Sequence, residues 1–214
     1  MKQYLFIFSL AVILTALPAH SAEISVAEIS VAEKLVFEID LRAGWTLHAE
    51  PPAILVTEAA SHIAHEPAAA NATAAQIETV ARKRMAANEA FLYHAASGAH
   101  LDIDFSPLEQ GASPPSTRTL RNSAEYAAQS LEGEDDVAGL VWKVTPVKIA
   151  GAAETFLLSA DYLQHNQPMT FLGYIGYAKG YWFFLYFTTP GKSPATLQEM
   201  QMMLDRASIR RVDR

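Results

Sequence analysis

The chain has 214 residues, half of them hydrophobic, and a formal net charge of −7 at pH 7. This length predicts one domain with enough apolar residues for a sizeable core. The acidic balance argues against a nucleic-acid-binding protein, because neutralising phosphates requires a basic surface. The chain has no cysteine, which excludes disulfide bonds and a thiol nucleophile, so ordinary core packing must stabilise the fold.

Residues 1–22 have the pattern of a secretory signal peptide. Met1-Lys2 gives a basic start, residues 4–17 are almost wholly apolar, and residues 19–21 (AHS) match a small-x-small cleavage site. A retained membrane anchor is the alternative, but the apolar run is short for a bilayer and ends in Pro18. We therefore expect export, to a bacterial periplasm or out of the cell, and no integral membrane segment after cleavage.

The exported chain is predicted to consist of a flexible lead-in at 23–33 and a single α+β domain at 34–214. The lead-in reads EISVAEISVAE, a five-residue duplication that fits neither helix nor strand periodicity, so we expect it to be mobile or loosely paired. Residues 35–41 (LVFEIDL) alternate between apolar and mostly acidic positions, which indicates a half-buried strand. A short strand is expected at 54–56.

Periodicity predicts the other elements in order along the chain. Apolar residues at three- and four-residue spacing predict helices at 73–96, 116–131 and 195–206. Alternation predicts strands at 100–108, 140–145, 147–149, 154–162 and 209–212.

The most apolar stretch after the leader, residues 171–187 (FLGYIGYAKGYWFFLYF), raises the question of a membrane span. As a helix it would reach only about 26 Å at 1.5 Å per residue. It would also place Lys179 at the bilayer centre, which costs roughly 2.5–3.5 kcal/mol. A transmembrane helix is therefore disfavoured.

The same stretch is well suited to a β-hairpin with a two-residue turn at 179–180. That turn pairs Gly176 with Phe183 and Gly173 with Tyr186, so that an aromatic ring can lie over each glycine. Both faces of such a hairpin are apolar. We therefore expect it to be covered by helices on both sides, or to lie centrally in a strongly curved sheet.

Two segments resemble PsbP-like proteins. VKIAGAAETFLLSADY (147–162) resembles the strand–Gly-Ala–strand element of that family, and residues 180–212 resemble its closing strand, loop and helix, with Ser208 where the family commonly has a serine. The resemblance covers about residues 71–212. It implies the α/β/α sandwich of the PsbP-like and DcrB-like superfamily, an α+β fold in which helices pack on the faces of an antiparallel sheet. Its known members are mostly not enzymes, and no residue-level site can be transferred.

His62 and His65, in HIAHEP, form the most metal-like cluster. Zinc hydrolases use HExxH or HxxEH, so that two ligands share one helix face, and the order HxxHE matches neither. The two histidines could still share a helix face, with a third ligand from His48, Glu58 or elsewhere. The alternatives are a surface loop without a role and adventitious metal binding.

Tyr177 and Trp182 are the candidate ligand-binding residues, lining a pocket between sheet and helix, and core packing is the alternative. Asp102 and Asp104 could serve as paired acid–base carboxylates, although alternation on a half-exposed strand predicts the same pattern. No GxSxG, GxGxxG or P-loop motif is present.

We therefore expect an exported, non-catalytic protein that binds another protein or an envelope component and needs no cofactor. A carrier of a small apolar ligand is the alternative hypothesis. A metal-dependent hydrolase built on His62 and His65 is the third.

Overall fold

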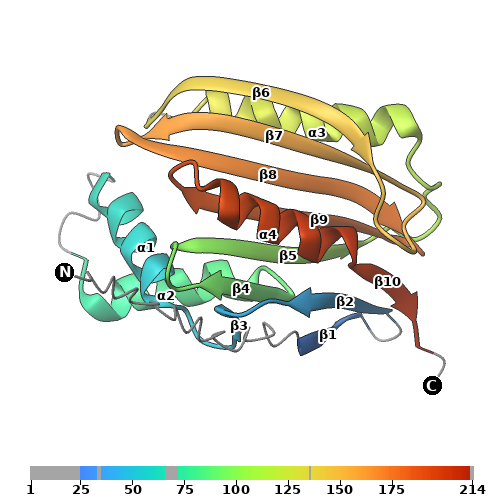
Figure 1. The fold of residues 1–214 in the computed structure, drawn as a ribbon, viewed down its shortest axis with the longest axis horizontal. Coiled ribbons are helices and arrows are strands. Elements are labelled where there is room, and N and C mark those ends of the chain that lie inside the picture. Colours follow the sequence, from blue (N-terminus) through green and yellow to red (C-terminus); the bar gives the residue numbers. More distant parts are fainter. Residues whose placement is uncertain (1–24, 33–34, 66–71, 135, 213–214) are drawn as a thin grey trace, which may run out of the picture.

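The computed structural model describes residues 25–32, 35–65, 72–134 and 136–212 (Figure 1). The signal peptide predicted at 1–22 lies outside these residues. Within them, strands form two antiparallel sheets on which helices pack, which confirms the predicted α+β fold.

A seven-stranded sheet forms the centre of the molecule, in the order β3-β4-β5-β9-β8-β7-β6. Its strands are β3 (Trp45–His48), β4 (Ala90–His94), β5 (Ala99–Pro107), β6 (Val137–Val147), β7 (Glu154–Gln164), β8 (Gln167–Ala178) and β9 (Tyr181–Pro190). A smaller sheet has the order β1-β2-β10, with β1 (Ser25–Ala32), β2 (Leu35–Leu41) and β10 (Ser208–Arg211).

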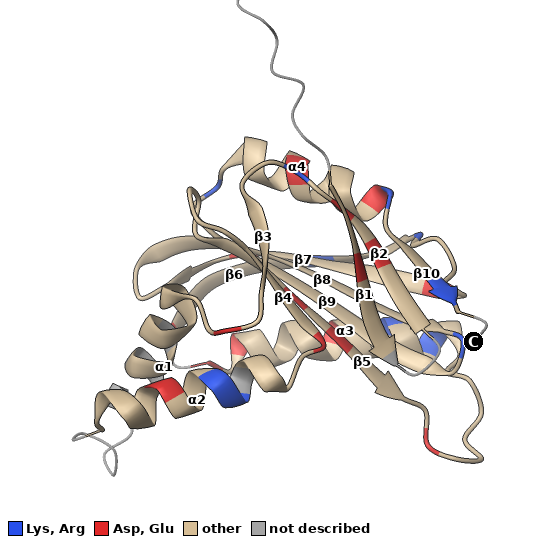
Figure 2. Ribbon diagram, turned by 90° about the horizontal axis from the view of Figure 1, so that it is seen from below, with Lys and Arg blue, Asp and Glu red and all other residues tan. Residues whose placement is uncertain are grey.

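The helices are α1 (Ala53–His65), α2 (Ala74–Ala86), α3 (Thr117–Glu132) and α4 (Pro194–Asp205). Figure 2 shows α4 on one face of the large sheet and α1, α2 and α3 on the other. The main core lies on the α4 side, where the small sheet also packs. Its buried side chains come from alternate positions of the central strands, from β2 and from α4, and include Leu101, Ile103, Phe105, Phe183, Leu185, Phe187, Phe37, Ile39, Met200, Met203 and Leu204.

The hairpin predicted at 171–187 is confirmed, with strands longer than expected. Lys179 and Gly180 form its turn, and both have positive φ (53° and 100°), as the tightest hairpin turns require. Gly176 pairs with Phe183, and a Cβ on Gly176 would lie 2.6 Å from Cε1 of that ring and 2.8 Å from the Glu154 carbonyl oxygen. The ring therefore occupies the space that any other residue would need.

The predicted strand 54–56 is wrong, because those residues lie in α1. The segment is rich in β-branched residues, which favour strands locally. In the fold, however, Leu55 and Ala59 are buried one turn apart against Ala81 of α2 and Phe91 of β4. Packing of this helical stripe outweighs the local preference.

The predicted helix 73–96 is too long. It ends at Ala86, and residues 90–94 (AFLYH) form β4, which pairs with β5. Gly98, with φ of 71°, belongs to the turn of this hairpin rather than to a helix end. The strands predicted at 140–145 and 147–149 form one continuous strand, β6, that ends at Val147.

Most of the lead-in at 23–33, expected to be mobile or loosely paired, is a strand, since residues 25–32 form β1 and pair with β2. A five-residue repeat in a strand of period two places equivalent residues on opposite faces. Val26 of the first copy is 64% exposed, whereas Val31 of the second is 2% exposed. The duplication thus buries only part of its apolar residues, Ile29 and Val31 among them.

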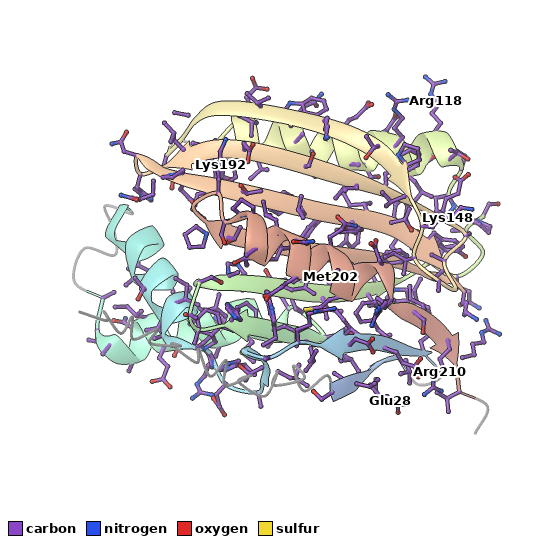
Figure 3. All side chains as sticks on the ribbon, in the orientation of Figure 1. Glu28, Arg118, Lys148, Lys192, Met202 and Arg210 are labelled. Carbon is purple, nitrogen blue, oxygen red and sulfur yellow. The ribbon has the colours of Figure 1, made fainter. Side chains whose placement is uncertain are left out.

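Arg210 of β10 forms ion pairs with the other two strands of the small sheet. Its guanidinium contacts Glu38 of β2 and lies 2.8 Å from Glu28 of β1, and Ser208 Oγ donates to Glu38 Oε2 at 2.9 Å. Figure 3 shows Glu28 and Arg210 close together at this sheet. The hydrogen bond from Arg210 lowers the pKa of Glu38, and that from Ser208 lowers it further. One charged cluster therefore links β10 to β1 and β2, which lie close together near the other end of the sequence.

We predict that Gly176→Ala destabilises the protein by about 1–3 kcal/mol, because the added methyl group overpacks against Phe183 and Glu154. Urea unfolding measures the change. Gly133→Ala is the matched control, since Gly133 has φ of −83° and the nearest atom to its added Cβ would be 3.5 Å away. Equal effects of the two substitutions would contradict the prediction.

We predict that Arg210→Gln lowers stability at neutral pH and weakens its pH dependence. A carboxylate with a lowered pKa stabilises the fold above its ordinary value, 4.5 for Glu38, and that contribution disappears as the pH falls through the lowered pKa. Urea midpoints at neutral pH and at pH below 4.5 measure both effects. Arg206→Gln, which removes a looser 3.7 Å contact to Asp40, is the control. An unchanged pH profile for Arg210→Gln would show that the cluster contributes nothing.

Candidate functional site

Helix α3 forms one wall of the candidate site, opposite the sheet. Ser116 caps it by accepting a hydrogen bond from the Thr119 amide at 3.1 Å. Leu120, Ala124 and Ala128 lie at four-residue spacing and are buried against the sheet. Small alanines let the helix lie close to β7, whereas the side of α3 toward β9 is left open, as the groove described next shows.

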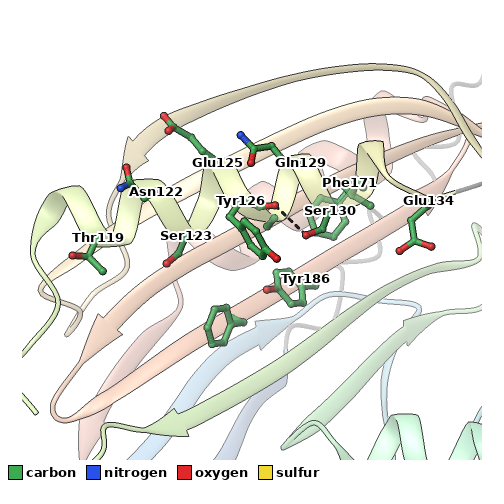
Figure 4. A pocket seen from close by; sticks show the side chains of 13 residues that line it. Thr119, Asn122, Ser123, Glu125, Tyr126, Gln129, Ser130, Glu134, Phe171 and Tyr186 are labelled. Carbon is green, nitrogen blue, oxygen red and sulfur yellow. Dashed lines mark hydrogen bonds between the residues drawn. The ribbon is translucent and has the colours of Figure 1, made fainter.

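A groove of about 910 Å³ runs between α3 and the β8–β9 hairpin and is open to solvent (Figure 4). Three aromatic rings, Phe171 of β8 and Phe184 and Tyr186 of β9, form its floor. The α3 wall and the turn after it contribute mainly hydroxyl, amide and carboxylate groups: Thr119, Asn122, Ser123, Glu125, Tyr126, Ala127, Gln129, Ser130, Leu131 and Glu134.

The floor rings form a continuous row along the sheet. The centroid of Phe171 lies 5.6 Å from that of Tyr186, which lies 5.9 Å from that of Phe184. Phe184 in turn stacks on Trp182 at 6.2 Å with an interplanar angle of 3°. In β9, Trp182, Phe184 and Tyr186 alternate with buried core residues. One strand therefore supplies both the core and the aromatic row.

Tyr126 extends from α3 at the mouth of the groove and is 71% exposed. Figure 4 shows its ring hanging from the helix above the floor, near Tyr186. Its ring adds exposed apolar area beside the aromatic floor of the groove.

Carboxylates of β5 lie directly beside the aromatic row. In the sheet register Asp104 is opposite Phe184 and Asp102 opposite Tyr186, all on the same face. Burial raises the pKa of Asp104. Burial also raises the pKa of Glu89, and the Asp104 charge raises it further. Tyr186 behaves likewise, since burial and then Asp104 raise its pKa to about 12. Asp104 and Tyr186 are partly buried and Glu89 is exposed, so the negative charge lies at a partly solvated border of the sheet.

Tyr177 and Trp182, the candidate ligand-binding residues, form a directly opposed pair on the α3 side of the hairpin. They are partly buried in the cluster that includes Leu120, Phe156 and Ile175, and they lie near the hairpin turn. The groove itself is lined by rings farther along the same face. Ligand binding by Tyr177 and Trp182 stays a prediction, with Trp182 one ring away from the groove.

The sequence interpretation missed Phe171, Phe184, Tyr186 and Tyr126. The first three alternate with core residues in the predicted hairpin, so the sequence contained the signal for a second aromatic face. No pattern in the sequence indicated which end of that aromatic face α3 would cover.

His62 and His65 belong to the last turns of α1, and their side chains lie outside what the structure describes. The backbone places them three residues apart on a helix rather than in the surface loop considered as the alternative. Among the described residues, no group of three or more metal-ligating side chains is found. Metal binding by the two histidines stays a prediction.

A smaller hollow of about 390 Å³ lies on the opposite side of the sheet, between β6, β7 and α4. Its lining mixes charged and apolar groups, including Lys143, Asp161 and Leu197. Asp161 is already engaged there, because it accepts hydrogen bonds from Thr170 at 2.7 Å and Lys192 at 3.2 Å. The α3 groove is the larger and more aromatic of the two.

No protein-family model and no curated protein sequence matches the chain. In structure the chain is similar to LpqN, which is involved in cell envelope biogenesis of Mycobacterium tuberculosis, with 8% identity and a TM-score of 0.49 over 87% of this chain and 91% of LpqN. It is also similar to cyanobacterial PsbP from Synechocystis sp. PCC 6803, with 9% identity and a TM-score of 0.48 over 92% of this chain and 98% of PsbP. Both similarities concern the fold alone and carry no argument about function.

In the described part of the chain, no helix has the length and apolar character needed to cross a bilayer.

We predict that Asp104→Asn stabilises the protein at neutral pH, because a carboxylate with a raised pKa opposes folding once it is ionised. The gain should disappear below pH 3.8, the ordinary pKa of aspartate, where the wild-type group is protonated in both states. The asparagine side chain keeps a carbonyl oxygen that can accept the hydrogen bond from the Ser106 hydroxyl. Unfolding midpoints at the two pH values measure the change.

Carboxyl NMR titration provides a second readout of the same substitution, since removing the Asp104 charge should lower the pKa of Glu89. Glu199→Gln on α4, on the opposite face, controls for the change of net charge. An unmoved Glu89 titration would show that the two carboxylates do not interact.

Proposed function

We propose that the protein is an exported, non-catalytic binding protein whose α3 groove holds part of another protein or an envelope component. The observation that carries this proposal is the row of aromatic rings at Phe171, Tyr186 and Phe184, partly exposed along an open groove of about 910 Å³. The signal-peptide pattern at 1–22 supports export.

The position of α3 favours binding over simple core packing. Near the hairpin turn, Leu120 and Ala124 bury Ile175 completely. Farther along, the same helix leaves Phe171 and Tyr186 partly uncovered, although both are large rings in ordered strands. Contiguous apolar surface rimmed by polar groups is typical of an interaction site.

The open shape favours a segment of a macromolecule over a small apolar ligand. Carriers of small molecules usually enclose most of the ligand surface, in pockets of about 300–1,000 Å³. The α3 groove has a volume near the upper end of that range but stays open to solvent. Hydroxyl and amide groups along α3, such as Ser123 and Gln129, can accept and donate hydrogen bonds to a polar backbone or headgroup.

Photo-crosslinking in the native host tests this function. A photoreactive phenylalanine analogue at Tyr126 should give a discrete adduct in the envelope fraction. The same analogue at Trp142 on β6, which lies away from the groove, should not. The adduct should disappear when Ser130→Trp fills the groove.

Circular dichroism establishes that the Ser130→Trp variant is folded. Adducts that are equal at both positions, or that persist in this variant, would contradict the proposed site. No adduct at either position would contradict a macromolecular partner.

A further inference from the structure

The α3 groove is negatively charged as well as aromatic. Of its lining residues, Glu125 and Glu134 are acidic and none is Lys, Arg or His. Glu125 accepts a hydrogen bond from Arg121 at 2.9 Å, which compensates part of its charge. Glu134 follows the end of α3 and is exposed at the groove, and no ion pair is found for it among the described residues.

Two further carboxylates lie beside the floor without lining the groove itself. Asp104 is paired across β5 and β9 with Phe184, and Glu89 lies just before β4, with its amide donating to the Ile103 carbonyl at 2.8 Å. The interaction between the two carboxylates is repulsive. Within the described residues, neither has a cationic partner. A cation that approaches these two carboxylates would gain Coulomb attraction.

From this arrangement we infer that the occupant of the groove is a basic segment of a partner protein, in which Lys or Arg side chains alternate with apolar ones. This inference rests on the proposed function and names the chemistry of its partner. A lysine or arginine side chain can lie over the faces of Phe184 and Tyr186 while its charge approaches Asp104. Apolar side chains fill the remaining space above Phe171.

Aromatic rings and carboxylates together select cations more strongly than either does alone. A guanidinium or ammonium group over a ring face is attracted by the ring quadrupole, by roughly 0.5–2 kcal/mol depending on desolvation. The carboxylates beside the row add Coulomb attraction, and it is strengthened because burial at Asp104 reduces screening by water. Arginine suits such a surface, since its planar group stacks on rings and donates to carboxylates at once.

The polar wall of α3 favours a peptide over a small free cation. Asn122 and Ser123, and two helical turns later Gln129 and Ser130, offer polar groups along the groove. A peptide backbone needs such partners along its length, whereas a small cation needs them at one point only.

Fluorescence anisotropy with three labelled peptides tests the inference. In each peptide leucine alternates with a second residue, which is arginine, glutamine or glutamate. The arginine peptide should bind the full exported chain most tightly and the glutamate peptide most weakly. Raising the salt concentration should reduce this difference, because exposed charges are screened beyond about 10 Å at 0.1 M salt.

Three variants distinguish the contribution of the Asp104 charge to binding from that of the aromatic floor. Asp104→Asn should weaken binding of the arginine peptide by about threefold to tenfold, and leave the glutamine peptide unchanged. Glu199→Gln on α4, with the same change of charge, should alter binding by less than about twofold. Phe184→Leu keeps an apolar floor but removes a ring, and it should reduce the preference for arginine over glutamine.

Each outcome has a distinct meaning. If all three peptides bind equally and Ser130→Trp abolishes their binding, the groove is a binding site but its preference for cations is refuted. If arginine-peptide binding survives Ser130→Trp, the site lies elsewhere and the inference fails. If no peptide binds, a basic partner segment is excluded, while the crosslink at Tyr126 still decides the proposed function.

Discussion

The packing of an aromatic ring onto a glycine across β8 and β9 is the constraint on which the rest of the fold depends. Phe183 lies over Gly176 on the core side, and Tyr186 lies opposite Gly173 on the α3 side. Each contact fixes the register of the two strands, because a shift by one residue would move every ring to the opposite face of the sheet. The central position of this hairpin extends that register to β5 on one side and β7 on the other.

A hairpin that is apolar on both faces needs two different covers, and the fold supplies them unequally. On one face α4 and the small sheet bury Phe183 and its neighbours completely. On the other, α3 covers the end near Ile175, and α1 with α2 packs over Phe91 at the far side of the sheet. The aromatic row between these two covers remains partly solvated. The groove is therefore a consequence of how the helices divide one face of the sheet.

Sequence patterns predicted the elements whose signals are local. Apolar spacing over residues 116–131 predicted α3, and the two-residue turn at Lys179 and Gly180 predicted the hairpin. They failed at residues 53–65, where Leu55 is helical only because α2 and β4 bury it. The groove could be foreseen only in part. Alternation predicts that Phe184 faces away from the core, but the angle at which α3 crosses the sheet depends on packing between distant segments, which local spacing does not encode.

The carboxylates beside the aromatic row are the point where stability and binding make opposite demands. Asp104 and Glu89 repel each other, and partial burial raises the pKa of both, so an amide at either position would fold at least as well. Local conflicts of this kind are expected where a surface serves a partner rather than the fold. A cation in the groove would remove the conflict, since it stabilises the ionised forms that burial disfavours. The charges that destabilise the free protein would then stabilise the complex. The repulsion between the carboxylates, which exists before binding, would thus favour a cationic partner over a neutral or acidic one.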